Sequence, residues 1–190
     1  MIPFTDNGAH VKDDYCTERR LWETVAFLRI HGVGEKILDI GESNFVGENI
    51  QADLNVRFQQ TDKNADLNWG FTLDPHGFDT VTCFEVIEHL MNPLFLVKAI
   101  WLSLKPSGVL YLSTPLHNPH GFFFNTTAHF AEYKEESLVT LLEYGGFAVT
   151  HTHRFKSIPF WQGMRKGVGL FRTFLRVSSQ ESIIIRAVKV

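Results

Sequence analysis

FDTVTCFEVIEHL, residues 78–90, joins a strand-like run directly to a helix-like run. The part that ends at Phe84 is short and apolar, which indicates a buried strand. Glu85, Glu88 and His89 follow it with the spacing of one helix face. In open α/β sheets, ligands bind outside the carboxyl ends of the strands. We therefore expect the residues around Phe84 and Glu85 to contact a bound molecule.

A second junction of the same kind occurs earlier, in the sequence KILDIG, residues 36–41. Here a short apolar run ends on Asp39 and Gly41. Because ligand sites in such sheets lie at the carboxyl ends of the strands, the two junctions together predict one cofactor cleft.

Helical and strand-like patterns alternate along the chain. The patterns predict helices over residues 17–31, 45–54, 93–104 and 135–144, and strands over residues 36–41, 56–61, 78–84, 109–114, 147–153 and 182–189. Short strands that alternate with helices are typical of a doubly wound, mostly parallel α/β sheet with right-handed crossovers. We expect that fold class.

The chain has 190 residues, of which 44% are hydrophobic and 21% charged, as expected for one globular domain. We expect a single domain over residues 1–190, with a helical cap over residues 1–35. Residues 1–10 lack the basic start and apolar stretch of a signal peptide, and no apolar run reaches the roughly 18 residues of a membrane span. These features predict a cytoplasmic protein without a transmembrane segment.

Basic residues gather in one late segment, although the net charge of the chain is -3. Residues 154–176 hold six basic side chains and no acidic one. We interpret residues 154–180 as an inserted, basic and amphipathic segment, whose part 161–176 could contact a membrane surface, an anionic acceptor or a partner subunit. An ordinary helix packed on the sheet is the alternative, and the acidic total argues against nucleic-acid binding.

The turn after the first strand lacks the glycine-rich G-x-G-x-x-G pattern of dinucleotide-binding folds. It carries Asp39 and Glu42 instead, and Glu42 would repel a pyrophosphate. An acidic turn favours a cationic ligand such as S-adenosylmethionine, which has a sulfonium, an ammonium and no phosphate. The alternative is that both carboxylates only cap and solubilise a loop.

In four blocks the chain resembles the class I S-adenosylmethionine-dependent methyltransferases, in the subgroup close to the ubiquinone-biosynthesis O-methyltransferases. The blocks are ILDIG (37–41), DTVTCFEVIEHLMNP (79–93), LKPSGVLYLSTP (104–115), and HF (129–130) followed by ESLVTLLEYGGF (136–147). The first block departs from the family pattern, because Ser43 and Phe45 stand where glycines are expected. The resemblance implies a Rossmann-like sheet of seven strands with an antiparallel last strand, and the seventh strand would lie near Phe71.

The resemblance also implies a set of cofactor-binding residues: Asp39, Gly41, Glu42 and Ser43 at the methionine part, Asp62 at the ribose, Asp66 and Leu67 at the adenine, and Phe84 and Glu85 closing the cleft. A carboxylate suits a ribose diol because each of its oxygens can accept one hydrogen bond. Which of Asp62 and Asp66 binds the ribose stays open, and a solvated loop acid is the alternative for either.

Metal-assisted relatives in the same superfamily use a similar E-x-x-E-H and a later histidine to hold a divalent ion. The matching residues here are Glu85, Glu88, His89 and His129. Such an ion would lower the pKa of a substrate hydroxyl and orient it. The alternative is that EVIEHL is only a common helix opening, with Glu85 near the cofactor.

Without a metal, methyl transfer to a hydroxyl needs alignment and a base. His89, His117 and His129 are the candidate bases, and His129 is our first choice, because the loop after strand 109–114 covers the acceptor side in the resembled family. This loop, residues 117–133, contains three consecutive phenylalanines from Phe122 to Phe124, which would form a lid or complete the core.

The sequence therefore predicts a methyltransferase that uses S-adenosylmethionine, with a divalent metal as an option, and acts on a small-molecule or glycan-type acceptor at oxygen. One alternative is a non-catalytic module that binds S-adenosylmethionine, favoured by Ser43 and Phe45. Another is a metal-assisted RNA 2'-O-methyltransferase, which the acidic net charge opposes.

Overall fold

The computed structural model describes residues 15–41, 45–62, 64–117, 129–156 and 181–190. In chain order the elements are α1 (Tyr15–His31), β1 (Ile37–Asp39), α2 (Phe45–Leu54), β2 (Phe58–Gln60), β3 (Phe78–Phe84), a 3-10 turn (Ile87–His89), α3 (Pro93–Ser103), β4 (Leu104–Pro115), α4 (Glu135–Tyr144), β5 (Phe147–Lys156) and β6 (Glu181–Lys189). The predicted alternation of helices and strands is confirmed.

The strands form one sheet in the order β2-β1-β3-β4-β6-β5. The pairs β1–β2, β1–β3 and β3–β4 are parallel, whereas β6 runs antiparallel to both β4 and β5. The predicted doubly wound, mostly parallel sheet with an antiparallel last strand is thus confirmed. The strand order reverses between β1 and β3, and the carboxyl ends of strands at such a reversal form the usual ligand crevice.

The prediction of a seventh strand is wrong for the described residues, which form a six-stranded sheet. Between β2 and β3 the described residues make turns and irregular backbone. Asp62 and Asp66 each accept a hydrogen bond from the backbone N–H two residues later. Such local bonds favour turns over strand pairing, which is the physical reason that no strand forms near Phe71.

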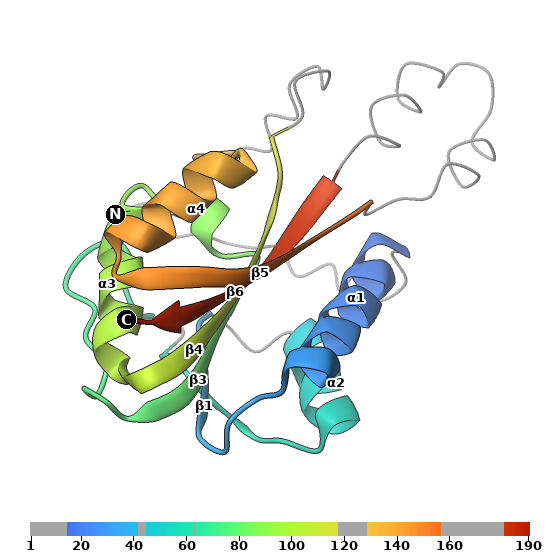
Figure 1. The fold of residues 1–190 in the computed structure, drawn as a ribbon, viewed down its shortest axis with the longest axis horizontal. Coiled ribbons are helices and arrows are strands. Elements are labelled where there is room, and N and C mark those ends of the chain that lie inside the picture. Colours follow the sequence, from blue (N-terminus) through green and yellow to red (C-terminus); the bar gives the residue numbers. More distant parts are fainter. Residues whose placement is uncertain (1–14, 42–44, 63, 118–128, 157–180) are drawn as a thin grey trace.

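Helices cover both faces of the sheet, so the domain has three layers (Figure 1). The side chains of β4 alternate between the two cores: Leu110 and Leu112 pack on the side of α3 and α4, and Tyr111 packs on the side of α1 and α2. This period of two is the expected property of a strand buried on both faces.

Three predicted regions fall partly or wholly on undescribed parts of the chain. The segment predicted over 154–180 begins inside β5, and its residues 157–180 lie outside the described residues. The phenylalanines 122–124 and the turn residues 42–44 lie outside them too. The division into a cap, a domain and an insertion therefore stays a prediction.

Candidate functional site

The first part of the site is the turn that follows β1. Asp39 is buried at the end of this strand, and the Thr82 hydroxyl of β3 donates a hydrogen bond of 2.6 Å to its Oδ1. Burial raises the pKa of Asp39 to about 6, and the hydrogen bond from Thr82 opposes this rise. A carboxylate that burial disfavours gains most from a cation placed next to it.

Gly41 turns the chain out of β1 with a φ of 119°. Few residues other than glycine adopt this conformation. The Thr61 hydroxyl, which follows β2, accepts a hydrogen bond from the Gly41 amide at 3.0 Å and donates one to the Gly41 carbonyl at 3.2 Å. The turn is therefore fixed by a neighbouring strand, while the predicted Glu42 and Ser43 lie outside the described residues.

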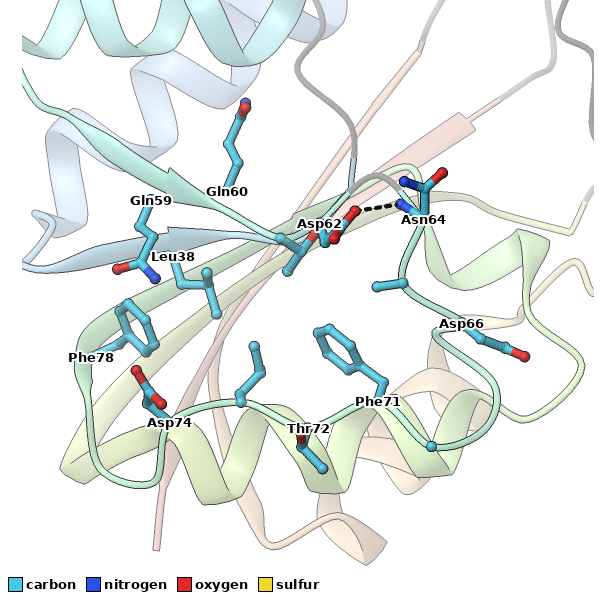
Figure 2. A pocket seen from close by; sticks show the side chains of 14 residues that line it. Leu38, Gln59, Gln60, Asp62, Asn64, Asp66, Phe71, Thr72, Asp74 and Phe78 are labelled. Atoms are coloured by element: carbon cyan, nitrogen blue, oxygen red, sulfur yellow. Dashed lines mark hydrogen bonds between the residues drawn. The ribbon is translucent and has the colours of Figure 1, made fainter.

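The second part of the site is a cavity of about 430 Å³ beside β2. Asp62 and Asp66 both contribute to its lining, with Leu38, Gln59, Phe71, Asp74 and Phe78 among the other lining residues. Figure 2 shows the Phe71 ring pointing into the cavity, whereas the Asp66 carboxylate points away from it. A volume of this size falls within the range of small-molecule sites.

The two acids that could bind the ribose, Asp62 and Asp66, each accept a hydrogen bond from a backbone amide two residues later. Asp62 Oδ1 accepts from the Asn64 amide at 2.8 Å, and Asp66 Oδ1 accepts from the Asn68 amide at 3.0 Å. These bonds fix the carboxyl groups and occupy one oxygen of each. Leu67, the predicted adenine contact, is partly buried and packs against the core on the side of the sheet covered by α3 and α4.

Glu85 follows β3 in a left-handed conformation, with a φ of 57°. Non-glycine residues adopt this conformation rarely, and such strain concentrates at functional sites. Its carboxylate accepts hydrogen bonds from Arg20 of α1 at 2.6 Å and from the Ser113 hydroxyl of β4 at 2.8 Å. The predicted grouping of Glu85 with Glu88 and His89 on one helix face is wrong, because residues 87–89 form a single 3-10 turn.

The third part of the site is a cluster of Glu88, His89 and His129, whose potential ligand atoms all lie within 4.8 Å of one another. The amides of Phe130 and Ala131 both donate to the Glu88 carbonyl, at 2.8 and 3.2 Å, and this pairing brings His129 to the cluster. Of the four predicted metal ligands, the structure therefore gathers three, while Glu85 pairs with Arg20.

Burial perturbs the ionisable groups of this cluster. Burial and then the charge of Glu85 raise the pKa of Glu88 to about 8, although the Thr114 hydroxyl donates to its carboxylate at 3.0 Å. Burial and then the nearby His89 lower the pKa of His129, which favours the neutral imidazole. Carboxylate and imidazole ligands together suit a divalent cation, so the donor set fits one.

His117, the third candidate base, is not a member of this cluster. Its Nδ1 lies 3.3 Å from the Glu132 carboxylate near the surface. Arg20 is the functional candidate that sequence reasoning missed. It lies 65 positions before Glu85, and no local motif marks it.

Comparison with known families gives a match to a methyltransferase domain over residues 14–152. Among curated proteins, the chain is similar to a ubiquinone biosynthesis O-methyltransferase of Xanthomonas campestris pv. campestris, with 30% identity over 119 residues. The match covers 60% of this chain and 46% of the relative. The chain thus matches about half the length of the curated relative.

Solved structures share the fold at lower identity. A methyltransferase-like protein from Bacillus halodurans superposes with a TM-score of 0.59 at 20% identity, covering 87% of this chain and 98% of its own. The phosphoethanolamine N-methyltransferase 2 of Haemonchus contortus, solved with S-adenosyl-L-methionine, gives 0.60 at 16% identity, covering 88% of this chain and 52% of its own.

Proposed function

Because this chain belongs to the methyltransferase-domain family matched over residues 14–152, we propose that it transfers a methyl group from S-adenosylmethionine to an oxygen of a small-molecule or glycan-type acceptor. One observation carries this proposal. Acidic and imidazole groups lie at or just after the carboxyl ends of β1, β2 and β3, and the strand order reverses between β1 and β3. Relatives named as O-methyltransferases support oxygen as the atom that is methylated.

We propose the following cofactor contacts. The buried Asp39 carboxylate and the Gly41 turn face the cationic methionine end, where a positive charge offsets the cost of the buried carboxylate. The Asp62 oxygen that is not bonded to Asn64 accepts from the ribose hydroxyls. The adenine enters the cavity beside Phe71. Phe84 and Glu85 close the cleft on the other side.

In the transfer itself, the acceptor oxygen forms a bond to the methyl carbon while the bond from carbon to sulfur breaks. The electron pair of that bond stays on sulfur, which gives S-adenosylhomocysteine. The acceptor proton goes to the neutral imidazole of His129. His89, whose ring centroid lies 4.8 Å from that of His129, helps to hold this imidazole in place. The protein mainly supplies alignment and a base.

A metal-assisted version of the same reaction is the second candidate, and the gathered Glu88, His89 and His129 favour it. These three side chains would hold a divalent cation, which when bound lowers the pKa of an acceptor hydroxyl. Glu85 would join them only by leaving Arg20. His129 cannot be both a ligand and the base through the same nitrogen, so the two versions predict different responses to a chelator.

The proposal does not extend to a membrane or nucleic-acid partner. None of the helices within the described ranges combines the length and the apolar character that crossing a bilayer requires. The basic stretch that suggested RNA or membrane contact lies mostly in residues 157–180, outside the described residues.

Isothermal titration with S-adenosylmethionine and S-adenosylhomocysteine tests the proposal. We expect binding of both, weaker in Asp62→Ala and unchanged in Asp74→Ala, a matched control because Asp74 lines the same cavity near Phe78. Absence of binding to either ligand would overturn the enzyme proposal. Repeating activity assays with a chelator separates the two versions, since only the metal-assisted one loses activity.

A further inference from the structure

A row of three polar side chains crosses the sheet on the face covered by α1. Tyr111 of β4 lies opposite Arg186 of β6, and Arg186 lies opposite His151 of the edge strand β5. Directly paired residues on neighbouring strands point to the same face. Tyr111 belongs to the core between the sheet and α1, so this is the face of α1.

A β-bulge in β5 turns the His151 side chain toward this row of residues. The register of β5 against β6 shifts between Val149 and His151, which leaves Thr150 as the extra residue. The Thr150 hydroxyl donates to the Arg186 carbonyl at 3.1 Å and accepts from Arg186 Nη1 at 2.8 Å. Bulges commonly redirect a side chain at a functional position.

His31, in the last turn of α1, completes the group. Its ring centroid lies 4.2 Å from that of His151 and 4.5 Å from that of Phe27. Burial, and then the nearby His151 and Arg186, lower the pKa of His31. Among the described residues, no carboxylate contributes to this shift, and both neighbours that act on His31 oppose its protonation.

Two residues further along β5, the same face is arranged differently. His153 Nε2 lies 2.9 Å from the Glu23 carboxylate, which also pairs with Arg19. Within the described part of the chain, no carboxylate forms an ion pair with Arg186, whose side chain bonds to Thr150 and Tyr111 while its Nε has no partner. Basic groups directly opposite one another destabilise a sheet unless something offsets their charge.

We propose that His31, His151 and Arg186 form a binding site for a phosphate-class oxyanion, either free phosphate or a phosphate group in a lipid headgroup. A guanidinium pairs well with phosphate oxygens, and the ring N–H groups of two imidazoles add hydrogen-bond donors. The three donors come from three different elements, α1, β5 and β6. A metal cation on the two imidazoles would be repelled by Arg186.

The site implies a pH dependence of binding. A bound phosphate oxyanion favours the protonated form of His31, which burial and its basic neighbours otherwise disfavour, so binding and the charge of His31 are linked. The neighbouring Tyr111 hydroxyl donates to the Gly32 carbonyl at 2.5 Å. Among the described residues, the charged groups on this face include His153 and Arg19, which both pair with Glu23.

Histidine ring NMR of the full chain at pH 6.0, titrated with inorganic phosphate against chloride at equal ionic strength, tests the site. We expect saturable shifts of the His31 and His151 rings, assigned through His31→Gln and His151→Gln, and no shift of His153. Arg186→Gln should weaken phosphate binding about tenfold or more, because a hydrogen bond to a charged group is lost. No saturable shift, or equal affinity in Arg186→Gln, would overturn the proposal.

The exposed His151 provides a variant that should fold even if Arg186→Gln does not. His151→Gln should lose phosphate binding yet keep the wild-type affinity for S-adenosylhomocysteine, which makes the result independent of the methyltransferase proposal. Sedimentation with phosphatidic acid vesicles distinguishes the two phosphate sources: co-sedimentation that His151→Gln abolishes indicates a lipid headgroup, and binding of free phosphate alone indicates a small ligand. Zinc binding by the wild type with no response to phosphate would contradict the anion site.

Discussion

The two ends of the candidate cleft hold their acidic groups in different ways. At the cofactor end, Asp62 and Asp66 are tied to backbone amides two residues away. At the acceptor end, Glu85, which we propose closes the cofactor cleft on that side, is tied to Arg20, 65 positions away, and Glu88 to Thr114, 26 positions away. The cofactor end is therefore built from local sequence, whereas the acceptor end depends on the assembled fold.

The largest expected effect tests the acceptor end. His129→Ala should lower kcat about 100-fold or more, the usual contribution of a general base, with little change in the affinity for S-adenosylmethionine. Steady-state kinetics and isothermal titration measure the two quantities separately. His117→Ala is the matched control, because its imidazole faces Glu132 near the surface. Equal losses in both variants would remove His129 from the reaction.

The next effect tests the cofactor end. Asp62→Asn keeps an oxygen that can accept from the Asn64 amide but loses the charge offered to the ribose, so binding should weaken about tenfold or more. Asp66→Asn should have a smaller effect, because its carboxylate points away from the cavity in Figure 2. Titration of both variants with S-adenosylhomocysteine decides which acid binds the ribose. A larger loss in Asp66→Asn would reverse our assignment.

Asp39 belongs to the cofactor end by sequence but is buried like Glu88 at the acceptor end. Its pKa of about 6 in the folded chain means that S-adenosylmethionine binding should strengthen about tenfold from pH 5 to pH 7, as the carboxylate ionises. Isothermal titration across this range measures the slope, and Asp39→Asn should flatten it. A pH-independent affinity in the wild type would exclude Asp39 as a partner of the cationic end.

The Asp39 carboxyl group also affects the stability of the fold, and this effect changes with pH in the direction opposite to cofactor binding. Since its folded pKa lies above the ordinary value of 3.8, the native state binds this proton more tightly than the unfolded state. The contribution of Asp39 to the free energy of unfolding is therefore greatest below pH 4 and decreases, by on the order of 3 kcal/mol, as pH rises through 6. Urea unfolding of the wild type and of Asp39→Asn at pH 4.5 and pH 7 separates the contribution of Asp39 from the contributions of other titrating groups.

The contrast between the locally built cofactor end and the acceptor end, which depends on the assembled fold, also explains what the sequence could predict. Apolar runs that end on Asp39 and Glu85 predicted β1 and β3, because periodicity and burial act locally. The Arg20 contact could not be predicted, because helix α1 reaches Glu85 only through the packing of α1 on the sheet. The prediction of a strand near Phe71 was wrong for a related reason. It followed the family pattern, whereas Asp62 and Asp66 of this chain form local hydrogen bonds that favour turns.

The smallest expected effect tests the link between α1 and the acceptor end. Arg20→Met leaves the Glu85 carboxylate with the Ser113 hydroxyl but without its counter-ion, and should cost about 1 kcal/mol in the free energy of unfolding. Arg29→Met on the same helix is the matched control, because the Arg29–Asp53 pair is largely exposed and such pairs contribute little. Chemical denaturation of both variants measures the difference.

Arg20→Met also separates the two versions of the reaction. If a divalent cation binds at Glu88, His89 and His129, removing the Arg20 charge should tighten its binding, because Glu85 becomes free to act as a fourth ligand and a nearby positive charge is gone. If His129 acts as a metal-independent base, the variant should respond to added Mg²⁺ or to a chelator no more than the wild type does. Arg20 would then serve to hold Glu85 in its strained conformation beside the cofactor, and its loss should raise KM for S-adenosylmethionine more than it lowers kcat.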